Sequence, residues 1–336
     1  MATKLIIITD AWDPQVNGVV TTYKNLIQHI PEHVHIEVIH PGLFKNFAFP
    51  FYKGIQVALC SKKNMRQILI DKHPSEIQVY YHIATEGILG LLARNVLRSA
   101  KIPYTSAYHT KFPEFFRAMY GIPIWMTKWY FDWFHKKSKY VMCSSKSSAN
   151  ENPQWNSVVL GKGYDSHFRF NDRFDSRNKV LLYVGRVSKE KNIEDFCRLP
   201  DSNDFYNYTK IVVGDGPDRK RLQKLYPKIH FVGYKFGEEL ASFYRNADVF
   251  VFPSKADTFG IVILEAMACG TPVAAYPVTG PIDQIIEGRN GSMFDDLHIA
   301  VDTCCRIDRG VVYFSVKNIS WANSARQFIN YVEGNV

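Results

Sequence analysis

The stretch that decides the fold is Val251–Gly270, VFPSKADTFGIVILEAMACG. An apolar run ends at Phe252, a polar loop carries Asp257, and an apolar helical pattern begins near Gly260. A strand that passes through a loop into a helix is the repeating unit of parallel α/β sheets, which bind ligands at the carboxyl ends of their strands. The stretch therefore predicts one such unit with a ligand site in its loop.

Two carboxylates flank the start of this helix. Asp257 lies just before it, and Glu265 follows after seven intervening residues, about a turn and a half inside. Free backbone N–H groups around Thr258–Val262 would attract a phosphate. The two carboxylates could then hold sugar and ribose hydroxyls on either side of a diphosphate. The alternative is an ordinary helix start, with Asp257 in its first turn and Glu265 solvated or paired.

Strand-like and helix-like runs alternate on both sides of this stretch, which predicts an α/β protein with two doubly wound sheets. We expect strands at Lys4–Thr9, His35–Ile39, Ile55–Leu59, Ile77–Tyr81, Tyr104–Ala107, Tyr140–Met142, Lys179–Val184, Lys210–Val213, His230–Val232, Asp248–Phe252 and Pro272–Ala275. We expect helices at Val19–His29, Glu86–Ser99, Ile124–Lys137, Asn192–Arg198, Pro217–Leu225, Gly237–Ala247, Gly260–Cys269 and Trp321–Tyr331.

The segment Gly161–Asn178 is polar and shows neither periodicity, so we interpret it as an interdomain linker. The expected domains are residues 1–165 and residues 166–318, the second of which carries the loop of Asp257. Residues 319–336 are expected to form a terminal helix that returns toward the first domain. Two such sheets should face a central cleft that holds the active site.

The segment Tyr183–Asn192, YVGRVSKEKN, follows another strand. Arg186 and Lys191 would lie between that strand's carboxyl end and the next helix. A guanidinium and an ammonium aimed at a diphosphate would stabilise the leaving group's charge. The alternative is a solvated run of charges.

The loop Asp10–Val20, DAWDPQVNGVV, joins the first strand to the first helix. Gly18 would allow a ligand close to the backbone there, although the loop is not a GxGxxG dinucleotide motif.

Charge and composition limit the kinds of partner and the cellular compartment that we expect for this chain. The net charge of +9 suggests a phosphorylated substrate or an anionic membrane surface, and no nucleic-acid-binding motif is present. The six scattered cysteines fit a reduced compartment. Because the chain enters the apolar run Leu5–Ile8 without a signal-type segment, we expect a cytoplasmic protein. No apolar run approaches the ~18 residues of a membrane span, so only peripheral attachment at the membrane's inner face is expected.

Together these segments resemble the retaining GT-B glycosyltransferases of family 4, the group 1 set. The resemblance covers nearly the whole chain and rests on the NGV loop, GRVSKEKN, VVGDGP, ADVFVFP, DTFG with its following Glu, and SWANSARQF, in that order. The family usually has Glu where this chain has Asp257. We interpret the DTFG form as the mark of a subgroup that resembles glycolipid-forming and mannosyl-transferring members.

The resemblance implies roles for individual residues. Gly18 would lie near the diphosphate, Arg186 and Lys191 would bind its phosphates, Asp257 would face the donor sugar, and Glu265 would bind the ribose. The amides of Phe259, Gly260, Ile261 and Val262 would lie near sugar and phosphate. Val232–Tyr234 would lie beside the base. His109, in the segment AYHTK at a strand end, would lie beside the donor sugar. The catalytic residues would be His109, Arg186, Lys191 and Asp257. The alternative for His109 is a histidine with a structural role only.

Two segments rich in aromatic and basic residues bear on the acceptor. Lys111–Tyr140 holds eleven aromatics, six Lys or Arg and two acids, and Phe44–Lys53 is a second such stretch. Trp125, Trp129 and Trp133 would form one helical ridge. Such a surface suits an anionic membrane and a lipid-linked acceptor, whereas the alternative is that the aromatic face belongs to the domain core. The candidate membrane contacts are Lys45, Lys53, Lys111, Lys128, Lys136 and Lys137.

The resemblance therefore implies a glycosyltransferase that moves a hexosyl group from a nucleotide-diphosphate sugar to a lipid or saccharide acceptor, with retention. No Asp-x-Asp motif is present, so we expect no metal and no further cofactor. The rival hypotheses are a sugar-nucleotide epimerase or phosphorylase of the same fold, and a non-catalytic nucleotide-sugar-binding module.

Overall fold

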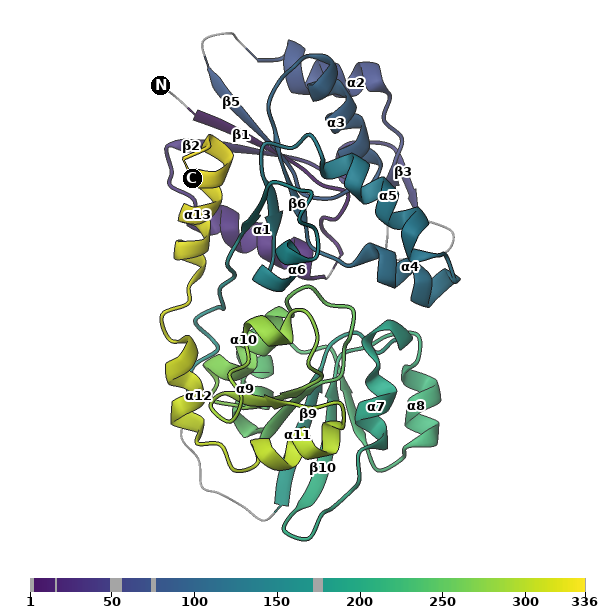
Figure 1. Cartoon of the computed structure of the whole chain (residues 1–336), viewed down its shortest axis with the longest axis vertical. Coiled ribbons are helices and arrows are strands. Elements are labelled where there is room, and N and C mark those ends of the chain that lie inside the picture. The colour runs from purple at the N-terminus through teal and green to yellow at the C-terminus, as the bar shows by residue number, and fades with distance from the viewer. Residues whose placement is uncertain (1–2, 16, 49–55, 74–76, 172–177, 336) are drawn as a thin grey trace. The chain divides into compact units, whose positions relative to one another are not determined.

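The computed structural model describes residues 3–15, 17–48, 56–73, 77–171 and 178–335. The chain divides into two compact units, residues 1–162 with 321–336, and residues 163–320 (Figure 1). Sequence analysis placed these boundaries at 165 and 318.

The first unit is built on a six-stranded parallel sheet in the order β2-β1-β5-β6-β7-β8. Its strand β1, between β2 and β5, contains Leu5–Ile8, each at most 1% exposed, because helices cover both faces of a doubly wound sheet. The strands are β1 (Thr3–Ile8), β2 (Val34–Ile39), β5 (Gln78–Ile83), β6 (Thr105–Tyr108), β7 (Val141–Cys143) and β8 (Ser157–Val159).

The C-terminal helix belongs to the first unit, where α13 lies beside α1 (Figure 1). Phe328 of α13 is fully buried against Tyr23 and His82. The helices of this unit are α1 (Gly18–His29), α2 (Lys62–Arg66) with a π-helical turn (Gln67–Asp71), α3 (Ile88–Ser99), α4 (Phe112–Tyr120), α5 (Ile124–His135), α6 (Lys146–Asn150) and α13 (Trp321–Glu333).

The second unit has a six-stranded parallel sheet in the order β11-β10-β9-β12-β13-β14. Successive residues of its central strands face different cores: Leu181 and Val251 pack on one side, Leu182 and Phe250 on the other. The strands are β9 (Asn178–Val184), β10 (Asn207–Val213), β11 (His230–Gly233), β12 (Val249–Phe252), β13 (Val273–Ala275) and β14 (Gly291–Met293). The helices are α7 (Ile193–Arg198), α8 (Arg219–Leu225), α9 (Gly237–Asn246), α10 (Ile261–Ala268), α11 (Leu297–Cys304) and α12 (Arg309–Val316). Two doubly wound, Rossmann-like α/β units are thus confirmed.

Several sequence expectations need correction. The strand expected at Ile55–Leu59 is β4 (Gln56–Ala58), which pairs antiparallel with β3 (Asn46–Ala48) in a separate hairpin and not in the parallel sheet; residue 55 lies outside the described residues. The elements β3, β8, β14, α2, α4, α6, α11 and α12 were not anticipated, because short or aromatic-rich elements show no clear period.

The segment expected to be the interdomain linker contains the boundary between the two units and has no helix or strand in residues 161–171, but buried side chains anchor it to both units. Lys162 is buried in the first unit, and Tyr164 and Phe168 pack on a core of the second. Phe170 stacks on Tyr313 of α12 with ring centroids 5.6 Å apart. The polar composition of the segment concealed these anchoring side chains.

Candidate active site

The second sheet changes its winding direction between β9 and β12. The chain runs outward from β9 through β10 to β11, then returns to β12 on the other side of β9. Loops that leave neighbouring strands in opposite directions form the usual ligand site of such sheets. The β9 loop carries Arg186 and Lys191, and the β12 loop carries Asp257.

Lys191 and Asp257 meet at this point of the sheet. Lys191 Nζ donates to Asp257 Oδ1 at 2.6 Å, and the two side chains are 30% and 24% exposed. Burial raises the pKa of Asp257, but the charge of Lys191 and its hydrogen bond outweigh burial and hold the pKa below its usual value. Asp257 is therefore a carboxylate at neutral pH and is reachable from solvent.

The N-terminus of α10 adjoins this ion pair. Its N-cap, Gly260, has φ of 80° and provides no side-chain cap, and the first turn contains no acidic residue. A Cβ at Gly260 would lie 2.9 Å from the Phe252 ring, so only glycine fits the turn. Phe259, Ile261 and Val262 are all half-buried. An uncapped N-terminus with a partial positive charge is suited to bind an anion.

Residues that follow β13 pack against the loop before α10 and hold it in place. Gly280 has φ of 95°, and a Cβ there would lie 3.1 Å from the carbonyl oxygen of Asp257. Gln284 Nε2 donates to the carbonyl of Phe259 at 2.5 Å. These contacts orient the loop that carries Asp257.

Glu265 lies one to two turns inside α10 and is half-buried. Tyr244 of α9 donates its hydroxyl to Glu265 Oε2 at 2.9 Å. Burial raises the pKa of Glu265 to about 7, although the bond from Tyr244 acts in the opposite direction. Glu265 therefore changes charge near neutral pH.

The loop that carries Arg186 is supported by two glycines of VVGDGP. A Cβ at Gly214 would lie 1.9 Å from the carbonyl oxygen of Gly185, and a Cβ at Gly216 would lie 2.3 Å from that of Val187. The amide of Val187 also donates to the carbonyl of Asp215 at 2.9 Å. From the sequence, the motif VVGDGP was recognised only as part of the family resemblance, and its packing against the loop that carries Arg186 was not predicted. Glycines at 185, 214 and 216 after two neighbouring strands were the available signal.

The base-side segment Val232–Tyr234 ends β11 and enters a loop. Tyr234 is 53% exposed and stacks on Phe236, with ring centroids 6.1 Å apart and an interplanar angle of 19°. An exposed aromatic pair after the sheet is compatible with a base beside it.

The structure places Gly18 and His109 in the first unit, whereas Arg186, Lys191, Asp257 and Glu265 belong to the second. Gly18 begins α1 and is exposed, and a Cβ there would meet no atom within 4 Å. His109 follows β6, with Nε2 3.0 Å from the Tyr23 hydroxyl and Nδ1 3.2 Å from Ser144 Oγ. Both ring nitrogens thus contact side chains of their own unit, which supports the structural alternative for His109.

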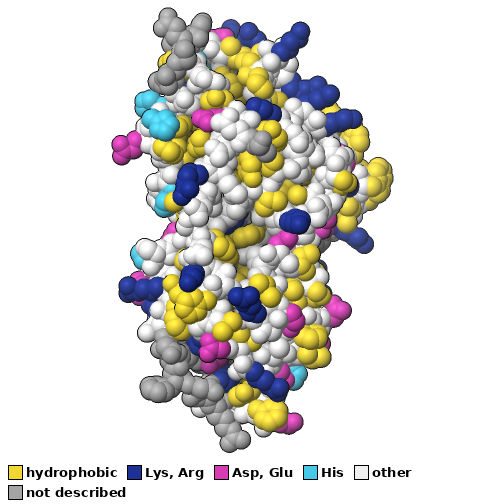
Figure 2. Space-filling view, turned by 60° about the vertical axis from the view of Figure 1, so that its left-hand side comes forward, with side chains coloured by type: hydrophobic (Ala, Val, Ile, Leu, Met, Phe, Trp, Pro, Cys, Tyr) yellow, Lys and Arg dark blue, Asp and Glu magenta, His cyan; other side chains and the backbone are white. Residues whose placement is uncertain are grey.

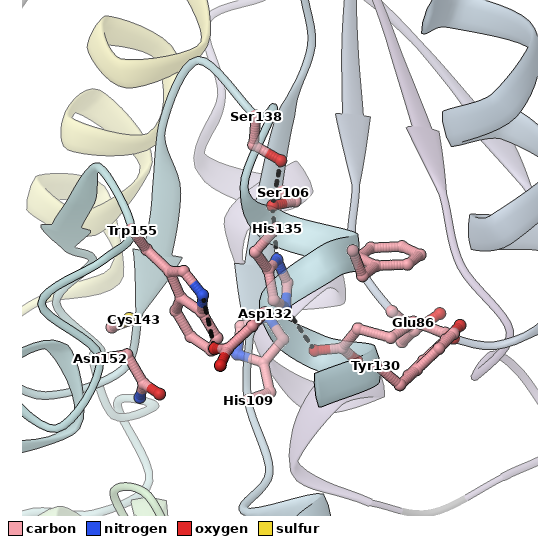
Figure 3. Close-up of polar contacts among 12 residues, drawn as sticks. Glu86, Ser106, His109, Tyr130, Asp132, His135, Ser138, Cys143, Asn152 and Trp155 are labelled. Carbon is pink, nitrogen blue, oxygen red and sulfur yellow. Dashed lines mark hydrogen bonds and ion pairs between the residues drawn. The ribbon is translucent and has the colours of Figure 1, made fainter. Parts of the chain in front are cut away.

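Sequence analysis missed a buried polar network around α5. Figure 3 shows His135 between Ser106 and Glu86, with Nδ1 2.8 Å from Ser106 Oγ and Nε2 3.2 Å from Glu86 Oε1. His135 and Ser106 are at most 1% exposed. Since a substrate cannot reach them, this serine–histidine–glutamate arrangement anchors α5 and is no hydrolytic triad. Arg94 adds to the anchor by donating to the carbonyls of Trp133 and Phe134 at 2.6 and 2.8 Å.

The opposite side of α5 is open. Trp125, Met126 and Trp129 are 72, 49 and 70% exposed, whereas Phe131 and Phe134 are buried. In Figure 2, hydrophobic side chains (yellow) protrude beside Lys and Arg (dark blue) on the visible face of the first unit. The alternative that the whole aromatic face belongs to the core is therefore wrong for Trp125 and Trp129 and right for Phe131 and Phe134.

The candidate basic contacts of this surface differ in their surroundings. The prediction that Lys111 lies at the surface is wrong, because its side chain is buried, with 8% of the residue exposed, and pairs with Glu151 at 2.7 Å. Lys128 is half-buried and donates to Asn152 at 3.1 Å. The others are Lys45, Lys136 and Lys137, which are exposed, and Lys53, which lies outside the described residues.

Two findings concern metals and membranes. Within the described ranges, no three His, Cys, Asp or Glu side chains converge as metal ligands would. No helix in the same ranges has both the length and the apolarity needed to cross a bilayer.

Residues 164–298 match the sequence model of the glycosyl transferases group 1 family. The second unit therefore contains a glycosyltransferase group 1 domain. The matched region contains Arg186, Lys191, Asp257 and Glu265. It therefore covers the cluster at the carboxyl ends of β9 and β12.

Relatives of this glycosyltransferase transfer sugars. It is 28% identical over 330 residues to the GDP-mannose-dependent alpha-mannosyltransferase of Corynebacterium glutamicum, across 87% of this chain and 76% of the relative. It is 26% identical over 321 residues to the alpha-monoglucosyldiacylglycerol synthase of Streptococcus pneumoniae, across 80% of this chain and 70% of the relative. Its fold matches that of Anabaena HepE, crystallised with UDP and glucose, with a TM-score of 0.68 and 15% identity over 98% of this chain and 99% of that protein.

These comparisons confirm the group 1 glycosyltransferase domain, the GT-B fold and the glycosyltransferase activity expected from the sequence. They favour the transferase over the epimerase, phosphorylase and binding-module hypotheses. The roles assigned to individual site residues, and the absence of a metal requirement, stay predictions.

Proposed function

We propose that the enzyme moves a hexosyl group from a nucleotide-diphosphate sugar to a lipid or saccharide acceptor, with retention of anomeric configuration. The observation that carries the donor assignment is the cluster of Lys191, Asp257 and the uncapped α10 N-terminus at the carboxyl ends of β9 and β12. Each feature alone has an ordinary structural explanation, but together they suit a phosphorylated sugar.

The diphosphate would be held by positive groups. The ammonium of Lys191 has three donors, of which Asp257 takes one. Its other donors, the Arg186 guanidinium and the α10 amides would stabilise the charge that develops on the departing phosphate. Gly18 would allow the diphosphate close to the backbone of its own turn.

The sugar and ribose would be held by the two carboxylates. Asp257, ionised at neutral pH, would accept hydrogen bonds from hydroxyls of the donor sugar. Glu265 would accept them from the ribose when it is ionised. Tyr234 would lie beside the base.

Transfer with retention requires attack from the face that the leaving group vacates. The bond from the anomeric carbon to the phosphate oxygen breaks, the acceptor oxygen bonds to that carbon on the same face, and the acceptor proton passes to the departing phosphate. No metal ion is needed in this scheme. The anomeric configuration of the product, read by NMR, tests it, since an inverted product would refute retention.

The donor and acceptor are best found with a panel. Purified enzyme is incubated with UDP-, GDP- and ADP-sugars carrying a labelled hexose, together with diacylglycerol or phospholipid vesicles or with soluble sugars. We expect a labelled product with one nucleotide class. Hydrolysis or no reaction with every donor, from folded protein, would refute the proposed function.

A lipid acceptor is supported by the outward face of α5. Trp125 and Trp129 are more than two-thirds exposed on a helix that is anchored from within, and Lys136 and Lys137 follow at its end. Aromatic side chains prefer the bilayer interface, and lysines attract anionic headgroups. We therefore propose that the enzyme acts as a peripheral protein at the cytoplasmic face of a membrane.

A further inference from the structure

Lys162 is a buried lysine that the proposed site does not use. It follows β8 at the carboxyl edge of the first sheet and is 4% exposed. Its Nζ lies 3.2 Å from Thr22 Oγ1, and Thr22 in turn donates to the carbonyl of Gly18 at 2.7 Å. The ammonium therefore lies beside the first turn of α1.

The other buried lysines of the described residues show how this chain normally accommodates such a charge. Each has a carboxylate partner at 2.7 to 3.8 Å: Lys111 with Glu151, Lys179 with Asp248, and Lys210 with Asp201. Lys162 has none among the described residues, and Thr22 is its one hydrogen-bond partner there. A buried ammonium with unused donors is costly, so its retention calls for a ligand.

The groups around Lys162 are basic or neutral. His82 of β5 and His109 after β6 both contact the hydroxyl of Tyr23 of α1, at 2.6 and 3.0 Å. Burial first, and then the charge of Lys162, lower the pKa of both histidines. Helix α13 adds uncharged groups beside them: Gln327 Oε1 accepts from the amide of Gly161 at 3.2 Å, and the centroid of the Phe328 ring lies 4.9 Å from that of His82.

We propose that Lys162 binds an anionic phosphoryl group of a substrate at the first turn of α1. This inference rests on the proposed function and adds a binding residue to it. The turn is exposed at Gly18, where a Cβ would meet no atom within 4 Å, so a phosphate can approach from that side. The phosphate would supply the counter-charge that the described residues of the first unit do not provide there. Its source is the donor diphosphate or a phosphorylated acceptor.

The test compares two buried lysines. Lys162→Met removes the unpaired charge and keeps the shape, whereas Lys210→Met removes a lysine that is bonded to Asp201 and to the carbonyls of Cys197 and Leu199. Dissociation constants are measured by calorimetry for UDP, GDP and pyrophosphate, and for glycerol 3-phosphate as the acceptor probe. Melting temperatures are measured in parallel.

For Lys162→Met we expect an unchanged or higher melting temperature and a dissociation constant raised about ten- to hundredfold, the worth of a hydrogen bond to a charged group. Loss of nucleotide and pyrophosphate binding assigns the donor as the source, and loss of glycerol phosphate binding assigns the acceptor. For Lys210→Met we expect a lower melting temperature and unchanged affinity. If Lys162→Met lowers stability and leaves every affinity unchanged, the proposal is overturned.

Proton uptake gives a second readout that a structural lysine would not change. Burial lowers the pKa of Lys162 to about 7, so at pH 8 it is mostly neutral, and a bound phosphate would draw a proton onto it. Calorimetry at pH 8 in buffers of different ionisation enthalpy should show uptake of about one proton by the wild type and clearly less by Lys162→Met. Equal uptake by both would contradict the proposal.

The two proposals fail in different ways. A protein that binds pyrophosphate through Lys162 but transfers no hexose from any donor refutes the proposed function alone. A protein that transfers hexose with unchanged affinity in Lys162→Met refutes this inference alone.

Discussion

Replacing Lys191 with alanine separates a catalytic charge from a structural one. The ion pair with Asp257 is 24 to 30% exposed, and pairs this close to solvent contribute at most about 1 kcal/mol to stability. For a chain of this size that corresponds to a fall of about 2–4 °C in melting temperature. Loss of a preorganised charge at a developing anion should cost about 2.7–4 kcal/mol, so kcat/KM should fall on the order of a hundredfold to a thousandfold.

The matched control is Lys189→Ala, because Lys189 lies in the same short turn and is exposed. Rates are measured with the labelled donor identified by the panel, and folding by circular dichroism and thermal melting. The control should keep near-normal activity. A folded Lys191→Ala enzyme with near-normal turnover would refute the leaving-group role.

A double-mutant cycle with Asp257→Asn tests the alternative that Lys191 acts only by orienting Asp257. If it does, Lys191→Ala has no further effect once Asp257 is replaced. A direct role on the diphosphate predicts a further loss of at least about tenfold in the double variant, since one lost charged hydrogen bond costs about 1.5–3 kcal/mol.

Four further predictions follow from the site and the α5 surface. Burial raises the pKa of Glu265 to about 7, and in the proposed role its carboxylate accepts hydrogen bonds from the ribose hydroxyls. The nucleotide dissociation constant of Glu265→Gln, divided by that of the wild type, should therefore rise from pH 6 to pH 8. A constant ratio would exclude the ribose role. Gly214→Ala places a Cβ 1.9 Å from the carbonyl oxygen of Gly185 and should lower both melting temperature and turnover, and normal values for both would contradict the supporting role of that glycine. Activity should survive EDTA, whereas complete loss restored by Mg²⁺ or Mn²⁺ would show a metal requirement. In co-sedimentation with anionic vesicles, binding should weaken as salt rises and leave a salt-resistant remainder. That remainder should disappear in a variant with both Trp125→Ser and Trp129→Ser. Wild-type protein that stays in the supernatant at low salt would refute the membrane proposal.

Local patterns were sufficient for most of the second unit, from β9 to β13, but not for β14, α11 and α12. In the part that they predicted, the polar residues of the loops stand directly after apolar strands. Because parallel strands end at one edge, Arg186, Lys191 and Asp257 could be predicted to lie at the same edge of the sheet without coordinates. The same reasoning failed where elements are short or aromatic-rich, as in β8 and α4.

Periodicity and position along the chain could not show which side chains are buried. Sequence alone left two interpretations of the α5 aromatics, and it placed Lys111 at the surface. The structure separates Trp125 from Phe134 because Arg94 and Glu86, both far from α5 in the chain, bind one side of the helix.

The sequence by itself thus determined the α/β class, the resemblance to the group 1 glycosyltransferases and the loops that carry Lys191 and Asp257, since these depend on periodicity and on order along the chain. Only the tertiary structure decided which charges are paired: Lys111 meets Glu151, whereas Lys162 is buried beside Thr22 without a carboxylate. The physical reason is that the cost of a buried charge depends on neighbours supplied by distant segments, and no local pattern in the sequence carries that information.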